Sequence, residues 1–440
     1  MNAAAPNVYL DITDLIQWVK KNDRVTGIQR VHLNYALHAM SRGVRFIMFH
    51  GRACADVTIV DPAVINYMGE LLSGQIPIDN ARLWRLCPNA RLETWQDYRD
   101  KYSGKPAKYY WHSMSSALKF YLTQLLFRRH SPGPDFRPGD VLLNVGRSWT
   151  IGGYVQNIEK LKRRHGISAQ LLLHDVIQIG HIQNPGESRI FTRFIRESFQ
   201  SFDRFFTSSE YNRGEIRRYM QEFCGSEKPI LKSFFGQQIN SEGSTQAPLP
   251  EGLAPQRYLL TVGRVAESKN QARLLEAWAR VLEAGQDGGL QLVVVGQLNR
   301  KYRAFNELLE SKPLLRQRVR VISNASDQEL DTLYRHCYFT VFPSLVEGFG
   351  LPAAESVSYG KFCLASNATS IPEAAGEHAA FFDPLDVSDI HAKLAQFIQS
   401  PALLREREAA IRATPLKSWA EATEDLLSKA RLPLPAPVSA

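Results

Sequence analysis

Two carboxylates eight positions apart, Glu347 and Glu355, are the residues of this sequence best placed to do chemistry. They lie in the string FPSLVEGFGLPAAE, which covers residues 342–355. An apolar run that ends at Phe342 predicts a strand, two glycines predict a loop, and Pro352 is tolerated in the first turn of a helix. Such a loop brings free backbone N–H groups and the positive end of a helix dipole to the edge of a sheet. The two carboxylates can therefore contact different parts of one anionic ligand.

This string carries a resemblance to a known family. Together with SIPEAAG at residues 370–376, it resembles the Glu-x7-Glu signature of the retaining glycosyltransferases of family GT4. The resemblance implies that Glu347 contacts hydroxyl groups of a donor sugar and that Glu355 binds the ribose of its nucleotide. A glycine lets the backbone approach a ligand closely, because it has no Cβ atom. We therefore expect donor contacts from the loop itself, at Gly348, Phe349, Gly350 and Leu351. The alternative is a helix N-terminus with incidental acidic residues.

A second loop between a predicted strand and helix carries two cations, Arg264 and Lys269. An apolar run over residues 258–262 leads into it and ends at Gly263. A planar guanidinium and a mobile ammonium group suit the oxygens of a diphosphate. The loop is similar to the Gly-Arg…Lys pattern of the same family, in which the cations neutralise the nucleotide diphosphate as it leaves. The alternative is a solvated basic loop with a common glycine turn.

The first half of the chain carries two further candidates, each after a predicted strand. Gly27 stands at the entrance of a helical pattern, where free N–H groups can bind a phosphate or a sugar oxygen. His174 and Asp175 follow an apolar run, at the sheet edge where α/β proteins bind ligands. The resemblance implies that Gly27 approaches the donor and that His174 lies beside the transferred sugar. Our acceptor-side candidates are Asp175, Gln29 and Arg30. Alternatively, Arg30 is an ordinary helix-surface charge, and His174 with Asp175 is a capping pair.

Elements that can position these residues recur along the whole chain. Short runs rich in β-branched and aromatic residues alternate with helical patterns, which is typical of parallel sheets built from β–α–β units. We expect strands over residues 8–12, 44–49, 141–145, 170–173, 204–208, 258–262, 291–295, 319–322, 339–342, 362–365 and 380–382. The fold class is therefore α/β with two Rossmann-like domains. The resemblance implies that they form a GT-B architecture, with parallel sheets facing a central cleft.

The length of 440 residues also favours two domains. Residues 237–256 are polar, rich in Ser, Gly and Pro, and without hydrophobic period, so they predict a linker. An acceptor-side domain at residues 1–236 then precedes a nucleotide-sugar-binding domain at residues 257–431, with a flexible tail at 432–440. Residues 52–138 have weak strand signals and predict an insertion. Within them, residues 109–129 mix aromatic, leucine and basic side chains, and either contact a membrane surface or pack as a helix.

The amino-acid composition indicates which kinds of partner the protein can bind. The net charge of +9 favours anionic partners such as nucleotide diphosphates, nucleic acid or acidic lipid headgroups. Five scattered cysteines without a C-x-x-C spacing indicate neither a zinc site nor a disulfide framework. No run of about twenty apolar residues and no signal-peptide pattern is found. We therefore expect a protein of the cytoplasm, or one held peripherally at the inner face of the cytoplasmic membrane.

The predicted function is retaining transfer of a hexose from a GDP- or UDP-sugar to a growing glycan. No Asp-x-Asp stands beside a predicted donor strand, so we expect neither a metal nor another cofactor. Arg264, Lys269 and a helix N-terminus can supply the positive charge instead. The resemblance implies a lipid-linked cell-surface polysaccharide intermediate as acceptor, and we expect no nucleic-acid partner. Two other classes remain open: a nucleotide-sugar epimerase of GT-B shape, and a non-catalytic protein that binds anions or membranes.

Overall fold

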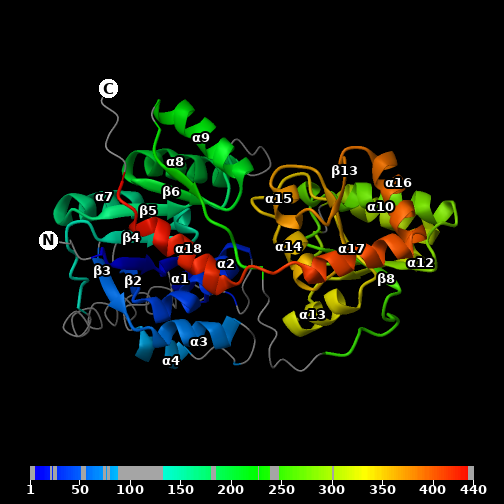
Figure 1. The fold of residues 1–440 in the computed structure, drawn as a ribbon, viewed down its shortest axis with the longest axis horizontal. Coiled ribbons are helices and arrows are strands. Elements are labelled where there is room, and N and C mark those ends of the chain that lie inside the picture. Colours follow the sequence, from blue (N-terminus) through cyan, green and yellow to red (C-terminus); the bar gives the residue numbers. More distant parts are fainter. Residues whose placement is uncertain are drawn as a thin grey trace, which may run out of the picture.

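A computed structural model describes residues 5–19, 22, 27–50, 56–72, 76, 80–87, 132–179, 185–225, 227–237, 247–299 and 302–434. Within these ranges the chain forms two α/β lobes that lie side by side. One lobe holds the N-terminal elements and the last helix, α18 (Trp419–Arg431), and the other holds the elements from β8 to α17 (Figure 1). Residues 109–129, for which membrane contact and a packed helix were both left open, lie outside the described residues. No helix of the described part is both long and apolar enough to cross a bilayer.

The first domain is built on a sheet that has seven strands among the described residues, in the order β3-β2-β1-β4-β5-β6-β7. All neighbouring pairs are parallel except β2 and β3, which are antiparallel. The strands are β1 Val8–Asp11, β2 Arg45–His50, β3 Asp56–Val60, β4 Val141–Asn144, β5 Ser168–Leu172, β6 Arg204–Thr207 and β7 Ile230–Lys232.

The second domain has a sheet in which the described strands run in the order β10-β9-β8-β11-β12-β13, and every pair is parallel. Its strands are β8 Tyr258–Val262, β9 Gln291–Val295, β10 Val319–Ile322, β11 Thr340–Phe342, β12 Cys363–Ser366 and β13 Ala380–Phe382. In each sheet the first strand in sequence lies in the interior, so the order reverses beside it. A crevice at such a reversal is where open α/β sheets bind ligands.

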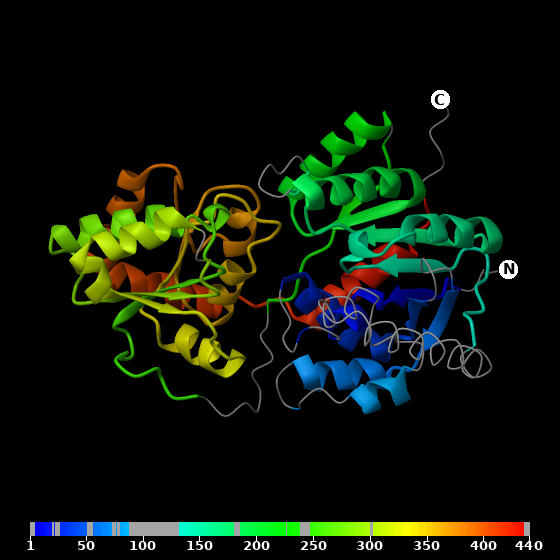
Figure 2. The same ribbon diagram turned by 180° about the vertical axis from the view of Figure 1, so that it is seen from behind.

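Helices cover both faces of each sheet (Figures 1 and 2). In the first half they are α1 Thr13–Val19, α2 Gly27–Ala39, α3 Ala63–Leu72, α4 Asn80–Leu86, α7 Tyr154–His165, α8 Pro185–Ser201 and α9 Glu210–Cys224, with short 3₁₀ turns η1 Met40–Arg42 and η3 Ser148–Thr150. In the second half they are α10 Gln271–Glu283, α11 Arg303–Ser311, α12 Pro313–Arg318, α13 Asp327–His336, α14 Leu351–Ser358, α15 Ile371–Ala375, α16 Val387–Gln399, α17 Pro401–Ala413 and α18 Trp419–Arg431, with the 3₁₀ turn η4 Glu267–Lys269.

The expected strands are all present, with ends that differ by at most two residues. Two strands were not predicted. β7 lies in a stretch between residues 208 and 258 where no strand was predicted, and β3 lies in residues 52–138, which were treated as an insertion. The antiparallel pairing of β3 corrects the expectation of a purely parallel first sheet.

The last helix, α18, corrects the predicted boundary between the domains. The sequence-based division placed residues up to 431 in the second domain, whereas α18 crosses back and packs on α2, β1 and β4 of the first, as its position in Figures 1 and 2 shows. Its apolar face, with Trp419, Leu426 and Leu427, joins the first domain's core. The buried Arg204 holds its end by donating to the carbonyls of Lys429 at 2.8 Å and Leu432 at 3.0 Å.

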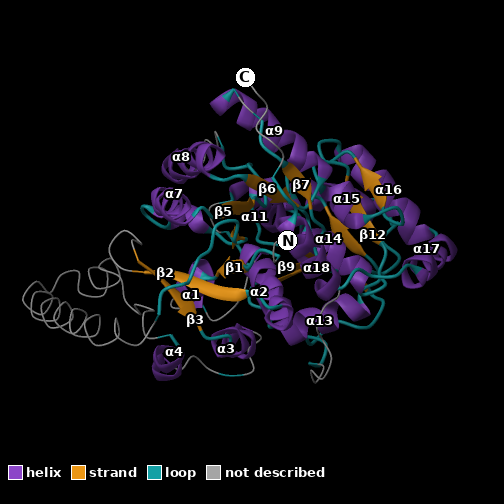
Figure 3. Ribbon diagram, turned by 60° about the vertical axis from the view of Figure 1, so that its left-hand side comes forward, coloured by secondary structure: helices purple, strands orange, loops and turns teal. Residues whose placement is uncertain are grey.

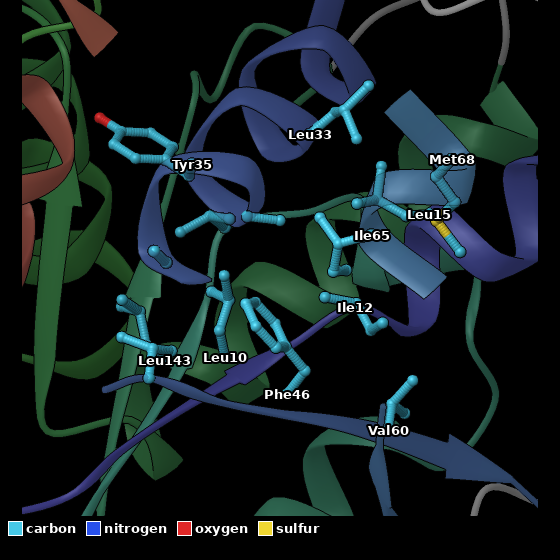
Figure 4. Close-up of a cluster of buried hydrophobic side chains, with 14 of the residues drawn as sticks. Leu10, Ile12, Leu15, Leu33, Tyr35, Phe46, Val60, Ile65, Met68 and Leu143 are labelled. Atoms are coloured by element: carbon cyan, nitrogen blue, oxygen red, sulfur yellow. The ribbon is translucent and has the colours of Figure 1, made fainter. Parts of the chain in front are cut away.

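That core lies between the first sheet and the helices α1, α2 and α3. Figure 4 shows Leu10, Phe46 and Leu143 of the sheet together with Leu33 and Ile65 of the helices. Burial of such side chains contributes about 1.5–3 kcal/mol each. The core fixes the start of α2 against the sheet, and α2 in turn meets α14 of the second domain on the side seen in Figure 3.

The chain passes between the domains along two adjacent segments. The backbone N–H of Gln237 donates to the carbonyl of Lys417 at 2.8 Å. A Cβ atom on Gly236 would lie 2.5 Å from the ring of Trp419, so only glycine fits this crossing. Of the predicted linker at residues 237–256, the described part comprises residue 237 and residues 247–256, and the crossing begins just before it.

Candidate active site

Glu347 lies in the loop between β11 and α14. Gly350, with φ of 102°, ends this loop and starts the helix, and Pro352 occupies its first turn, as predicted. The Glu347 side chain is 12% exposed, and its Oε1 accepts a hydrogen bond from Nζ of Lys269 at 2.5 Å. Ser370 donates to the Glu347 carbonyl at 2.8 Å. The segment noted in the sequence around residue 370 therefore supports the loop that presents Glu347.

Lys269 belongs to the neighbouring loop after β8, in η4. The two loops are joined by a backbone hydrogen bond from Leu345 to the carbonyl of Ser268 at 2.8 Å. Gly263, with φ of 149°, lies in the same loop, and the Lys269 side chain passes near it. Arg264 is exposed, and the structure shows no hydrogen bond or ion pair of its guanidinium with another described residue. Both predicted cations thus belong to one loop, and the ammonium group of Lys269 is the one that contacts a predicted site carboxylate.

Glu355 has one hydrogen-bond partner in each domain. Nη1 of Arg30, in α2, donates to its Oε1 at 2.5 Å, and the hydroxyl of Tyr334 donates to Oε2 at 3.0 Å. Burial and the adjacent carboxylate raise the pKa of Tyr334 well above 10, so it acts as a donor at neutral pH. Arg30 is therefore neither a free helix-surface charge nor directed at an acceptor alone. It pairs with the carboxylate that the resemblance assigns to the ribose.

Gln29 differs from expectation in orientation. The residue is 3% exposed, and its amide Nε2 donates to Oδ2 of Asp14 at 3.3 Å. The amide therefore points into the first domain, which corrects the expectation that it faces an acceptor. Helix periodicity explains the difference, because Arg30 points from α2 to Glu355 of the second domain, whereas Gln29, one position earlier, points to Asp14 of α1. Gly27 begins α2 with φ of 38°, and the space around a Cβ atom there is open.

His174 and Asp175 follow β5 at the carboxyl end of the first sheet. Nε2 of His174 lies 2.9 Å from the carbonyl oxygen of Val145, so this nitrogen carries the proton and donates. Burial lowers the pKa of His174 to about 4, and the ring is neutral at physiological pH. Asp175 accepts from the backbone N–H of Ile177 at 3.0 Å. Burial, and then the negative charge of Glu347, raise the pKa of Asp175.

Gly348 brings the two halves of the site together. A Cβ atom added there would lie 2.5 Å from Oδ2 of Asp175 and 3.1 Å from the His174 carbonyl. Phe349 also crosses to the first domain, where its ring lies 5.1 Å from that of Phe235, and Leu351 packs beside it against the same core. The structure therefore places Glu347, Lys269 and Asp175 around one point of domain contact.

Two polar features of this region were not found from the sequence. Asn212, in the first turn of α9, is buried and donates to the carbonyls of His174 and Gly348. His32 is fully buried in α2, with Nδ1 3.8 Å from Oδ2 of Asp14. In the sequence Asn212 looks like an ordinary helix-start residue after the Ser209 cap, and His32 looks like a member of an amphipathic helix. Nothing local marks either as a neighbour of the site.

A pocket lies beside His174 and Asp175 in the first domain. Its walls are mostly apolar and come from α2, β5, α8 and η3, with Ile28, Trp149, Phe191 and Phe194 among them. Gln178 adds an amide at the same place. An apolar pocket with a few polar groups is the usual form of a small-molecule site.

The second domain is similar in sequence to known proteins. Residues 250–415 match the family model of glycosyl transferases group 1. The serotype-specific mannosyltransferase WbdA of Escherichia coli is 33% identical over 168 residues, which are 38% of this chain and 20% of WbdA. The O-antigen chain mannosyltransferase B of Escherichia coli is 29% identical over 216 residues, which are 48% of this chain and 55% of that protein. The chain thus matches between a fifth and about half of the length of these relatives.

The fold extends the similarity to both domains. The crystal structure of Anabaena Alr3699/HepE in complex with UDP and glucose superposes with a TM-score of 0.58 at 12% identity, over 97% of this chain and 99% of that one. Two Rossmann-like domains joined by a returning C-terminal helix define this architecture as GT-B. The family match is confined to the C-terminal domain, at residues 250–415.

Proposed function

We propose that this chain is a retaining, metal-independent hexosyltransferase that uses a nucleotide-sugar donor. The observation that carries the proposal is the pairing of Lys269 with Glu347 at the mouth of the second sheet, directly opposite Asp175. A cation beside the sugar-binding carboxylate can take the charge of the leaving diphosphate. A preorganised charge at the position where charge develops is usually the largest single contribution to catalysis.

Each residue has a part in the proposed reaction. Lys269, and Arg264 from the same loop, neutralise the diphosphate, while Glu347 holds hydroxyl groups of the transferred sugar. Glu355 binds the ribose. Neutral His174 offers an uncharged ring beside the sugar, and the buried Asp175 orients the acceptor hydroxyl. The acceptor hydroxyl oxygen bonds to the anomeric carbon on the face from which the diphosphate leaves, as the bond from that carbon to the diphosphate oxygen breaks. The hydroxyl proton passes to the leaving diphosphate, so no protein nucleophile is needed.

The names of the relatives guide the choice of substrates. The matched Escherichia coli proteins are mannosyltransferases, and one acts on the O-antigen chain. We propose a mannose-type hexose on GDP as the first donor to test, ahead of UDP-sugars, and a lipid-linked polysaccharide intermediate as acceptor. The apolar pocket beside Asp175 is the proposed place of the acceptor.

The test is donor turnover by the purified full chain. The protein is incubated with GDP-, UDP- and dTDP-sugars, with and without a lipid-linked glycan acceptor, and the release of nucleotide and the anomeric configuration of the product are measured. We expect acceptor-dependent release that persists in EDTA, and a product that keeps the donor configuration. A sugar altered without transfer identifies an epimerase instead, and binding without turnover identifies a non-catalytic protein.

Two variants make the test specific to the site. Lys269→Ala removes the cation beside Glu347 and is expected to lower kcat by about 100-fold or more, as loss of one transition-state charge partner does. The matched control is Lys312→Ala, because Lys312 forms an exposed ion pair with Glu283 at 2.8 Å, outside the site. Equal loss in both variants, or none in Lys269→Ala, refutes the site assignment.

A further inference from the structure

Asn212 is fixed in the first domain by its own helix. Ser209 caps α9, and its side-chain oxygen accepts the backbone N–H of Asn212 at 3.1 Å. The Asn212 side chain is 1% exposed and is therefore not solvated. The backbone contact with Ser209 satisfies the helix start for any residue at position 212. A substitution of the Asn212 side chain can therefore test its contacts without removing the cap of the helix.

The side-chain amide of Asn212 donates hydrogen bonds to two loops of the site. It donates to the carbonyl of His174 at 3.1 Å and to the carbonyl of Gly348. The first carbonyl immediately precedes Asp175, and the second immediately follows Glu347. These loops belong to different domains, and the missing Cβ atom of Gly348 lets them touch. A neutral group with two donors is what two facing carbonyls require.

We infer that Asn212 is a positioning residue, which sets the register of the acceptor-side loop at residues 174–175 against the donor-side loop at residues 347–350. The inference rests on the proposed function, since it concerns the same site. The amide of Asn212 contacts none of the charged side chains proposed to bind the donor, so donor binding does not need this bridge. Transfer needs both loops at once, because the acceptor and the sugar must meet within about 3–3.5 Å.

The decisive variant is Asn212→Asp. It keeps the shape of the side chain, and a carboxylate in the first turn of α9 suits the helix dipole, so the helix is preserved. It replaces a double donor by an acceptor that faces two carbonyls. The matched control is Asn306→Asp in α11, because the Asn306 amide also donates to two carbonyls, those of Tyr302 at 3.1 Å and Asn299 at 3.4 Å.

We expect Asn212→Asp to lower kcat for transfer by about 100-fold at pH 8, the cost of a misplacement near 1 Å. The Kd for GDP or UDP stays within twofold of the wild type. As the pH falls, the buried carboxyl takes up a proton and regains one donor, so kcat of the variant recovers relative to the wild type. Asn212→Ala has no such recovery, and Asn306→Asp shows neither loss nor recovery.

A second measurement is independent of turnover. The bridge joins the domains, so Asn212→Asp is expected to increase the radius of gyration in small-angle X-ray scattering at pH 8, and Asn306→Asp is not. If the wild type transfers no sugar, the proposed function fails and the scattering still decides the role of Asn212. Wild-type kcat in Asn212→Asp, an unchanged radius of gyration, or a parallel loss of kcat and nucleotide binding overturns the inference.

Discussion

Replacing Glu373 by glutamine tests how the two domains are held together. Glu373 lies in α15 of the second domain, and its carboxylate caps the first domain's α9 by accepting the backbone N–H groups of Glu210 at 2.9 Å and Tyr211 at 3.0 Å. It also accepts from Nζ of Lys232 at 2.6 Å. Glu373→Gln keeps the size of the side chain and removes its charge.

The magnitude follows from these contacts. A side-chain cap contributes about 1 kcal/mol, and a carboxylate at a helix N-terminus about 0.3–1 kcal/mol. The ion pair adds little, because the Lys232 side chain is 38% exposed and water screens it. We call the arrangement in which Glu373 contacts α9 the closed form, and one in which this contact is broken the open form. If the closed form loses about 1–2 kcal/mol of stability, the ratio of closed to open molecules falls by roughly five- to thirtyfold.

The pKa of Glu373 predicts the direction in which pH changes the stability of this contact between the domains. Burial raises the pKa of Glu373, but the hydrogen bonds from Lys232, Glu210 and Tyr211 together outweigh it, and the pKa lies below its ordinary value of 4.5. A lowered pKa means that the contact stabilises the closed form fully above pH 4.5 and is lost as the pH falls through the lowered value. The wild type should therefore open in acid through this residue, and Glu373→Gln should not.

The assay is small-angle X-ray scattering of the full chain between pH 3.5 and 8, together with the KM for the donor. We expect a larger radius of gyration for Glu373→Gln at pH 7 and a smaller difference from the wild type in acid. Glu377→Gln is the control, since Glu377 is 84% exposed and lies two residues beyond α15. A Glu373→Gln protein as compact as the wild type at pH 7 refutes the reasoning.

Three further predictions concern single contacts. Gly348→Ala places a Cβ atom 2.5 Å from Oδ2 of Asp175. We expect this change to lower kcat by about 100-fold with little change in the melting temperature, and normal turnover would contradict the close contact. Tyr154→Phe removes a 2.5 Å hydrogen bond to the buried Asp11 carboxylate and should cost about 1–3 kcal/mol in urea unfolding, whereas a change below 0.5 kcal/mol contradicts it. Because burial lowers the pKa of His174 to about 4 from its ordinary 6.5, the free energy of unfolding should fall as the pH drops from 6.5 toward 4, and His174→Gln should flatten that fall in urea titrations.

The parts of the site that could be predicted from the sequence are those made within one short segment. The loop of Glu347 and Gly350 and the loop of Lys269 are each a strand end, a glycine turn and a helix start, and local patterns encode all three. The strands were predictable for the same reason, except β3 and β7.

Contacts between distant segments could not be predicted. Arg30 and Glu355 are 325 positions apart, and nothing around Arg30 distinguishes a partner in the other domain from solvent. Gln29 and Asn212 were misjudged or missed because the direction of a side chain depends on how its helix packs. The position of α18 depends on a docking surface built from β1, β4 and α2, which lie some 280 to 420 positions earlier in the chain.

The two ion pairs of the site affect which ligand the proposed enzyme can bind. Lys269 with Glu347 and Arg30 with Glu355 each join a cation to a carboxylate whose side chain is 12% exposed. A ligand that contacts only the cations leaves two shielded carboxylates without a cationic partner, which costs free energy. A nucleotide-sugar offers diphosphate oxygens to the cations and sugar or ribose hydroxyls to the carboxylates, so every group exchanges one partner for another. The paired site therefore favours the complete donor over inorganic pyrophosphate, and it does so through the same residues that the reaction requires.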